Sequence, residues 1–243
     1  MAILTETIPH SSDLGDQPFY LRVAYLIATI TVVGFAQLAL RGISHPLSVP
    51  IWVHLHALTA ASWLVLFLVQ NHLAADGNFT FHRRLGWVGT LLALAIVVFG
   101  FITAIKALEL HRVPPGFSPA YFLAVTMLQL VLFPVLVLAA ILLRREMQSH
   151  RRLMFGALIV ICGSPGITRM PPSNLMGGER GEWLVLLFEL ILLVVMMGHD
   201  RKIFGHIHRA TVAVVCCIVV AQLGPTIAAR MPAVKIIASR LQN

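Results

Sequence analysis

The stretch VGTLLALAIVVFGFITAIKAL, from Val88 to Leu108, decides the fold class, because it is long and apolar enough to cross a bilayer as one helix. About 20 apolar residues in a helix span the roughly 30 Å of hydrocarbon in a membrane. Short polar connections separate six further apolar runs: Val23–Leu40, Ile51–Val69, Ala120–Leu143, Leu153–Thr168, Trp183–Met197 and Thr211–Ala229. The chain therefore predicts an all-α polytopic membrane protein, a bundle of seven transmembrane helices over residues 21–229, with polar tails at 1–20 and 230–243.

The composition supports this class and excludes others. A mean hydropathy of +0.86 with 12% charged residues does not fit an ordinary soluble domain. The formal charge of +8 would suit a nucleic-acid partner, but the basic residues lie at the ends of the apolar runs rather than on one face. We therefore expect the lipid bilayer as partner and no nucleic acid. The cysteines fall inside apolar runs, where a thiol behaves as a small apolar group: Cys162, Cys216 and Cys217.

The basic residues also predict an orientation. The connections after the second, fourth and sixth runs carry nine Lys and Arg residues: Arg83, Arg84, Arg144, Arg145, Arg151, Arg152, Arg201, Lys202 and Arg209. The other three connections carry five: Arg41, Lys106, Arg112, Arg169 and Arg180. Because basic loops stay in the cytoplasm, the N-terminus is predicted to be cytoplasmic and the C-terminus periplasmic.

A His-Arg pair precedes three of the apolar runs, at His82, His150 and His208. Cations at a helix N-terminus oppose the helix dipole, so helix stability does not explain the arginines. Proximity to an anionic leaflet does, at about 1 kcal/mol for each basic residue. These arginines are therefore candidates to bind lipid headgroups or other anions: Arg83, Arg84, Arg151, Arg152 and Arg209. The histidines are not required for topology, and they leave phosphate or haem propionate binding open.

The strings FHRRLGWVG and SHRRLMFGALI, together with the earlier HLHALTAASWLVLFLVQ, resemble parts of bacterial multi-helix membrane families known only as domains of unknown function. Similar His-Arg helix starts occur in small membrane proteins associated with cytochrome oxidase maturation. The resemblance covers the second to the fifth apolar run. It implies a bacterial inner membrane, a membrane-protein partner, and respiratory or haem-related work.

Most of the eleven histidines fall at two depths of the predicted bundle. His54 and His72 are five helical turns apart, so they share a face at about 27 Å separation. Membrane cytochromes of the b type use such two-level ligands, although a second helix with this pattern is missing. His54 and His56 point about 160° apart and cannot chelate one ion from a regular helix. The candidate ligands for haem b or a transition metal are His54, His56, His72, His82, His150, His199 and His208.

Glu189 interrupts the apolar run WLVLLFELILLVV. An acid inside a membrane helix is costly, usually faces the bundle interior and marks a functional site. Glu182 shares its stripe of the helix, and similar depths on other helices carry the further polar candidates Gln129, Gln222, Ser62 and Thr59. The alternative is a set of unrelated hydrogen bonds between helices, each worth about 0.6 kcal/mol.

The sequence carries no HExxH, Walker, Rossmann or nucleophile-elbow motif, so it predicts no particular enzyme class. Three hypotheses follow. The first is a protein that binds b-type haem or a transition metal through histidines and serves redox chemistry or respiratory-complex assembly. The second is a small-solute or proton-coupled transporter built around Glu189. The third is an assembly partner without chemistry of its own.

Overall fold

The computed structural model describes residues 16–42, 48–171 and 176–243, and in these ranges the chain forms helices and turns without a strand. Six of the described helices are long and apolar enough to cross a membrane: α2 (Gln17–Leu40), α3 (Ile51–Ala75), α4 (Phe79–Glu109), α5 (Pro119–Leu142), α9 (Gly178–Phe204) and α10 (Arg209–Ala228). Large apolar side chains such as Trp87 and Leu94 are exposed on their outer faces, as lipid contact requires. The prediction of an all-α multi-pass membrane protein is therefore confirmed.

The apolar run Leu153–Thr168 does not form one continuous α-helix. It is divided among α6 (Met147–Leu158), the π-helix η2 (Ile159–Gly163) and α7 (Ser164–Arg169). Ser164 donates its N–H to the carbonyl of Ile159, five residues back, and Pro165 supplies no N–H to continue the α-helical ladder. The predicted seven spanning helices are thus not confirmed: six described helices are long and apolar enough, and this segment is broken where its backbone hydrogen-bond pattern changes.

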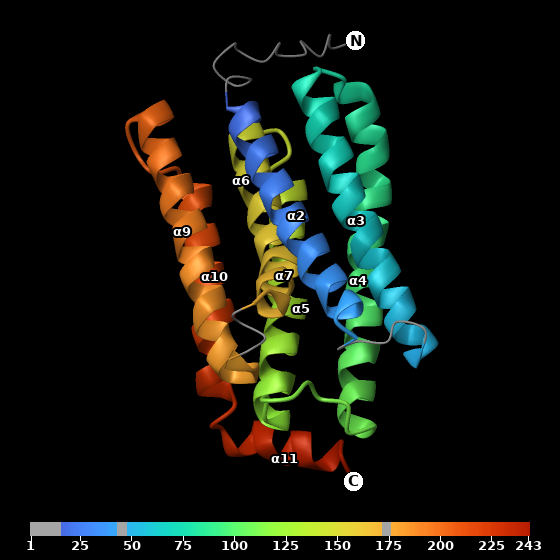
Figure 1. Ribbon diagram of the computed structural model, residues 1–243. Coiled ribbons are helices and arrows are strands. Elements are labelled where there is room, and N and C mark those ends of the chain that lie inside the picture. Colours follow the sequence, from blue (N-terminus) through green and yellow to red (C-terminus); the bar gives the residue numbers. More distant parts are fainter. Residues whose placement is uncertain (1–15, 43–47, 172–175) are drawn as a thin grey trace.

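The broken segment lies at the centre of the bundle. Figure 1 shows α9 and α10 on one side, α3 and α4 on the other, and α2, α5 and α6 between them. Within this arrangement α6 packs against α5 and α10, while α7 packs against α2 and α9. The apolar core includes Trp63, Phe133, Phe155 and Met196, all nearly inaccessible. The start of α2 and the C-terminal helix α11 (Pro232–Arg240) lie at opposite ends of the bundle (Figure 1).

A close backbone approach between α2 and α7 holds the break in place. A Cβ atom added to Gly34 would lie 2.5 Å from the carbonyl oxygen of Gly166, so neither helix tolerates a larger residue without moving. On the same face of α2, the hydroxyl of Thr31 donates to the carbonyl of Cys162 at 3.0 Å. That carbonyl belongs to the π-helix, where the normal helical partner is displaced. Helix α2 therefore satisfies backbone groups that the break exposes.

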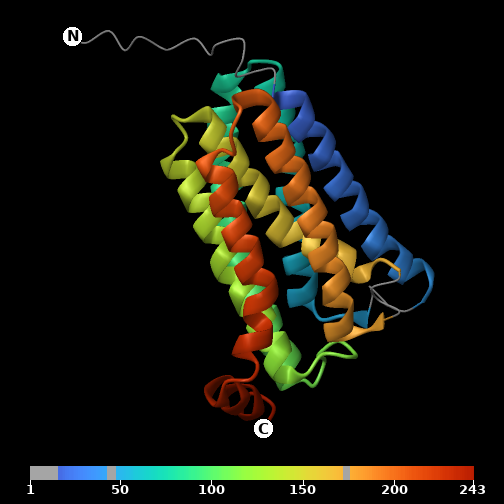
Figure 2. The ribbon, with the colours of Figure 1, turned by 90° about the vertical axis from the view of Figure 1, so that its left-hand side faces the viewer.

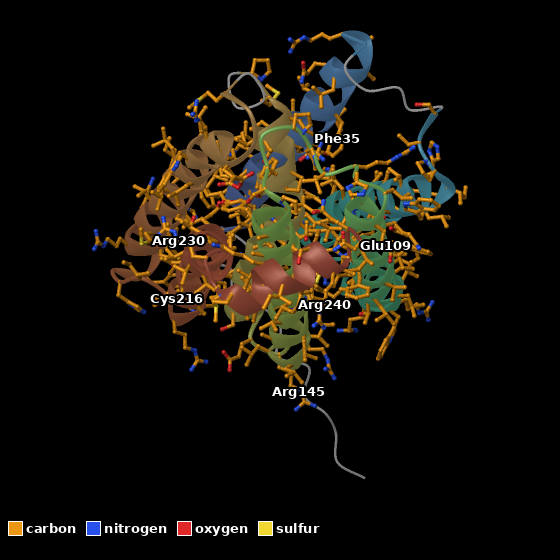
Figure 3. The ribbon with its side chains drawn as sticks, turned by 90° about the horizontal axis from the view of Figure 1, so that it is seen from below. Phe35, Glu109, Arg145, Cys216, Arg230 and Arg240 are labelled. Atoms are coloured by element: carbon orange, nitrogen blue, oxygen red, sulfur yellow. The ribbon has the colours of Figure 1, made fainter. Side chains whose placement is uncertain are left out.

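Several helices are longer than their apolar runs. Helix α4 begins at Phe79, where the side chain of Asn78 accepts from the N–H of Phe81, and capping lets it extend into the polar interface. At the N-terminus, Asp16 and Tyr20 are buried, so the packed chain begins inside the segment expected to be a tail. The expected C-terminal tail forms α11, which lies across the end of α5 (Figure 3) and buries Ala238.

Candidate functional site

A cavity of about 370 Å³ opens between the starts of α5 and α9 and the end of α10. These three segments meet at the end of the bundle that carries α11 (Figure 2). The polar side chains that line the cavity include Tyr121, Glu179, Glu182, Gln222, Thr226 and Arg230. The cavity therefore combines hydroxyl, amide, carboxylate and guanidinium groups at the edge of an otherwise apolar bundle.

Two acids on α9 lead from this cavity into the bundle. Glu182 lines the wall and is 8% exposed, whereas Glu189 is 1% exposed and lies two helical turns, or about 10 Å, deeper. The side chain of Gln222, which also lines the cavity, is hydrogen-bonded to Glu189. The expectation that Glu189 faces the interior and meets a polar side chain of another helix is thus confirmed.

Neither acid has hydrogen-bond partners for both of its carboxyl oxygens. Oε1 of Glu182 accepts from the hydroxyl of Thr168 at 3.4 Å, a long hydrogen bond. Within the described ranges, Oε2 of Glu182 and Oε2 of Glu189 are buried and have no hydrogen-bond partner. Buried polar atoms without partners are rare in native proteins and mark places where a proton, a water molecule or a ligand binds.

The broken segment supplies the polar groups opposite α9. Thr168 also donates to the carbonyl of Ser164 at 2.9 Å, and the hydroxyl of Ser164 accepts from the amide of Gln129 at 3.2 Å. A continuous polar path thus runs from α5 across α7 to Glu182. Arg169 ends α7 close enough for its charge to act on Glu182, and its guanidinium lies 4.2 Å from the centre of the Phe35 ring.

The entrance of the cavity is fixed by a link between the α4–α5 connection and α9. Both the N–H and the hydroxyl of Ser118 donate to Oε1 of Glu179, at 3.1 and 2.7 Å. Gly116 and Gly178 meet so closely that a Cβ atom on Gly178 would lie 1.9 Å from the carbonyl of Gly116. Arg230, exposed at the end of α10, also lines the cavity, two residues before α11 begins.

The structure unites only part of the predicted polar site. Gln222 contacts Glu189, and Gln129 joins through Ser164, as described above. Thr59 instead donates to the carbonyls of Leu55 and His56 in its own helix, and Ser62 shares that helix, which does not line the cavity. Depth along a helix was readable from the sequence, but the direction of each face was not. The hydroxyl groups of Tyr121, Ser164 and Thr168 were missed for that reason, although Pro165 marked the break that exposes two of them.

A second polar cluster lies at the opposite end of the bundle and corrects the prediction for Arg152. This side chain is 0% exposed and donates to Oδ1 of Asp200 from Nε and Nη2, at 2.9 and 2.6 Å. Its Nη2 also lies 3.2 Å from Oδ2 of Asp16, and the Nη1 of Arg151 lies 3.1 Å from the same oxygen. Arg152 is thus enclosed by protein and is not available to lipid headgroups.

The remaining predicted anion-binding residues differ in their surroundings. Arg83 and Arg84 are exposed, as lipid contact requires. Arg209 is exposed too, but it forms an ion pair with Glu146 at 2.5 Å. That ion pair and a hydrogen bond from Ser149 hold the pKa of Glu146 below its usual range.

The predicted histidine ligands separate into different environments. His54 and His72 are exposed on α3, and His72 hydrogen-bonds the hydroxyl of Tyr25 at 2.6 Å. The ring of His72 also packs edge-on against the ring of Tyr25. His56 is half-buried on the same regular helix, which keeps it apart from His54 as the helical geometry predicts. His199 bonds Asp16 and stacks on Phe19.

The His-Arg motif has a structural role that the sequence did not reveal. His82 and His150 each occupy the first turns of a helix, α4 and α6, and each bonds through Nδ1 to a backbone carbonyl of the preceding helix. The two rings come together, with centroids 6.2 Å apart. His208 instead caps α10, with its Nδ1 accepting from the N–H of Ala210 at 3.1 Å. In the part of the chain that is described, no group of three or more His, Cys, Asp or Glu residues has the geometry of a metal site.

Comparison with known proteins gives no family assignment. No family model, curated protein or solved structure matches this chain significantly.

Proposed function

We propose that the protein transports a small polar solute and couples its movement to protons through Glu182 and Glu189. The observation that carries this proposal is a pair of buried carboxyl groups, Glu182 in the wall of a polar cavity and Glu189 two helical turns deeper, each with one oxygen lacking a partner in the described structure. Ionisable residues inside a membrane bundle are expensive to maintain and mark proton or substrate paths by default.

The cost of burying a carboxylate favours a site that binds and releases a proton or a cation. A carboxylate in a low-dielectric environment is costly unless a proton, a cation or donor groups accompany it. Glu182 has a weak donor in Thr168 and the nearby charge of Arg169, whereas Glu189 has the Gln222 amide. Glu182 therefore faces the cavity with a partial counter-charge, and Glu189 accepts a proton more deeply in the bundle. A proton that moves between them changes the charge presented to the cavity.

The lining suggests the class of solute. The volume of about 370 Å³ lies at the small end of the range for ligand pockets, roughly 300–1,000 Å³. Glu179 and Arg230 place opposite charges at the rim, and hydroxyls from Tyr121 and Thr226 lie between α5 and α10. Opposite charges at one entrance suit a small zwitterion, whose amino and carboxylate groups each find a partner.

The finer topology belongs to this proposal. The segment α6–η2–α7 acts as a seventh, broken crossing, and broken helices at a binding site are common in transporters. The start of α2 and α11 lie at opposite ends of the bundle, which supports an odd number of crossings (Figure 1). With the basic connections in the cytoplasm of a bacterial cell, the cavity opens toward the periplasm. Reporter tags inserted in the α3–α4 and α9–α10 connections should be cytoplasmic, and a tag after Asn243 should be periplasmic; a cytoplasmic C-terminus would overturn this topology.

Proteoliposomes with a trapped pH-sensitive dye test the transport itself. A panel of small zwitterionic amino acids is added outside, and at least one should produce proton movement with the wild type. Glu182→Gln and Glu189→Gln should abolish the signal, while Glu109→Gln, the same change at an exposed acid of α4, should preserve it. A signal that survives Glu189→Gln, or no signal for the whole panel, would overturn the proposal.

A further inference from the structure

His82 and His150 make the same kind of hydrogen bond, each within a different helix hairpin. Nδ1 of His82 lies 3.2 Å from the carbonyl of Gln70 on α3, and Nδ1 of His150 lies 2.8 Å from the carbonyl of Ala140 on α5. A carbonyl oxygen only accepts, so each Nδ1 carries the hydrogen. In a neutral imidazole, Nε2 then carries a lone pair. Neither Nε2 atom makes a hydrogen bond within the described chain.

The distance between the rings fits a shared metal. The ring centroids are 6.2 Å apart and the ring planes are inclined by 80°. A metal–imidazole bond is about 2.0 Å long and the centroid lies about 1 Å behind the nitrogen, so two imidazoles in line on one metal have centroids about 6 Å apart. The rings belong to different helices, α4 and α6, so this separation is set by the packing of the bundle.

Two further features indicate that these histidines bind a ligand, and do not only join the two helices of each hairpin. Histidines that ligate metals almost always donate their other ring N–H to a carbonyl or carboxylate, and both rings do so here. In addition, Gln70 donates from its amide to the carbonyl of His82 at 3.1 Å, while its Oε1 is buried and has no donor among the described residues. The residue whose backbone carbonyl holds His82 thus also carries a buried acceptor without a donor among the described residues.

We propose that His82 and His150 bind one transition-metal centre through their Nε2 atoms. Imidazole suits copper, zinc, iron and nickel. Among the described residues only these two candidate ligands come together, and Arg83 and Arg151 follow the two histidines in sequence, so a singly charged ion costs less than a dication. Both points favour Cu(I), which accepts two nitrogen ligands in line. Haem iron between two imidazoles is the same coordination chemistry with the remaining positions filled by the porphyrin.

The test distinguishes the two roles of each histidine: metal binding by the lone pair on Nε2, and hydrogen bonding to the backbone by Nδ1. Asparagine places an amide N–H where Nδ1 of histidine lies, so His82→Asn and His150→Asn keep a donor for the hairpin and remove the metal ligand. The matched control is His206→Asn, at an exposed histidine of the α9–α10 connection. Purified full-length protein is titrated with Cu(I) against a colorimetric chelator, copper is counted by elemental analysis, and an absorption spectrum is recorded for haem.

Wild type and His206→Asn should bind one equivalent of Cu(I), and both test variants should lose it. A Soret band that the two test variants lose would also support the site and identify haem as the source of the metal. Equal copper in all four proteins, or neither copper nor haem in the wild type, would overturn the proposal. If an asparagine variant fails to fold, copper X-ray absorption of the wild type decides: two nitrogen neighbours support the site, and sulfur neighbours overturn it. Glu189→Gln should retain the metal, so this result is independent of the transport proposal.

Discussion

Removal of Arg152 should destabilise the protein far more than removal of any exposed arginine. The cluster at this end balances two guanidinium groups, Arg151 and Arg152, against the carboxylates of Asp16 and Asp200. Arg152→Met leaves Asp200 buried at 0% exposure without a counter-charge. Breaking a buried ion pair in this way costs about 3–5 kcal/mol.

This cost predicts a measurable change in thermal stability. For chains of this length, 1 kcal/mol corresponds to a Tm shift of about 2–4 °C, so Arg152→Met should lower Tm by roughly 6–20 °C. Intrinsic tryptophan fluorescence of the detergent-solubilised protein, followed during heating, gives the measurement. Arg209→Met is the matched control because its ion pair with Glu146 is solvent-exposed, and its Tm should stay close to that of the wild type.

A second substitution tests whether the loss of stability comes from the unbalanced buried charge. Asp200→Asn removes the unpaired charge but keeps an acceptor for the hydroxyl of Thr211, which donates to Asp200 at 2.5 Å. The double variant Arg152→Met/Asp200→Asn again balances one guanidinium with one carboxylate. It should therefore lose about 0.5–3 kcal/mol less than the sum of the single variants. Additive losses, or a Tm for Arg152→Met equal to that of Arg209→Met, would refute the charge-balance argument.

Three other perturbations have defined outcomes. Glu189→Gln should preserve Tm, whereas Glu189→Leu should lower stability by about 1–3 kcal/mol because it leaves the amide bonded to Glu189 without a partner, and thermal unfolding compares the two. Burial and nearby guanidinium groups lower the pKa of His208, whose Nδ1 must be unprotonated to cap α10. Its contribution to stability is therefore complete above about pH 6.5, the ordinary histidine value, and is lost as the pH falls through that value toward the folded pKa. His208→Ser keeps a cap that does not titrate, so its Tm should fall less between pH 7 and pH 5 than that of the wild type; an unchanged slope would contradict this. Gly166→Ala places a Cβ atom 2.9 Å from Cα of Thr31 and should cost about 1–3 kcal/mol, while Gly198→Ala, with open space around it, should cost nothing measurable.

Hydropathy identified the membrane-crossing runs because the cost of burying polar groups in lipid is local to each segment. The helix ends were less predictable, since capping groups such as Asn78 extend α4 beyond the apolar run. Among the apolar runs, Leu153–Thr168 is divided into three helical pieces, and it contains a local reason in Pro165, whose missing N–H comes directly after the π-helix. Hydropathy alone does not register a lost backbone donor, so it does not show where the hydrogen-bond pattern of this run changes.

The candidate site was predictable from the sequence only where a single polar residue stands inside an apolar stretch. Glu189 is such a residue, because an acid in an apolar run requires burial against polar groups whatever the fold. Asp16 is not, since an acid near a polar N-terminus looks unremarkable in sequence. Its partner Arg152 is 136 residues away, and only the packing of α2 against α6 joins them. The same limit explains why Arg152 was expected at the lipid surface and is found in the core.

The two polar clusters are mechanically linked, because the same two segments contribute to both. Helix α9 carries Asp200 at one end and Glu182 near the other, and the broken segment carries Arg152 before its π-helix and Thr168 after it. At the Arg152 end the contacts with α9 are short, charged and fully enclosed, whereas at the Thr168 end the hydrogen bond to α9 is 3.4 Å long and lies beside a cavity. The broken segment is thus joined firmly to α9 at one end and weakly at the other, while the close approach of Gly34 and Gly166 holds α7 against α2. Any movement that opens the cavity should therefore separate α9 from α7 near Glu182, with the charged cluster as its fixed end.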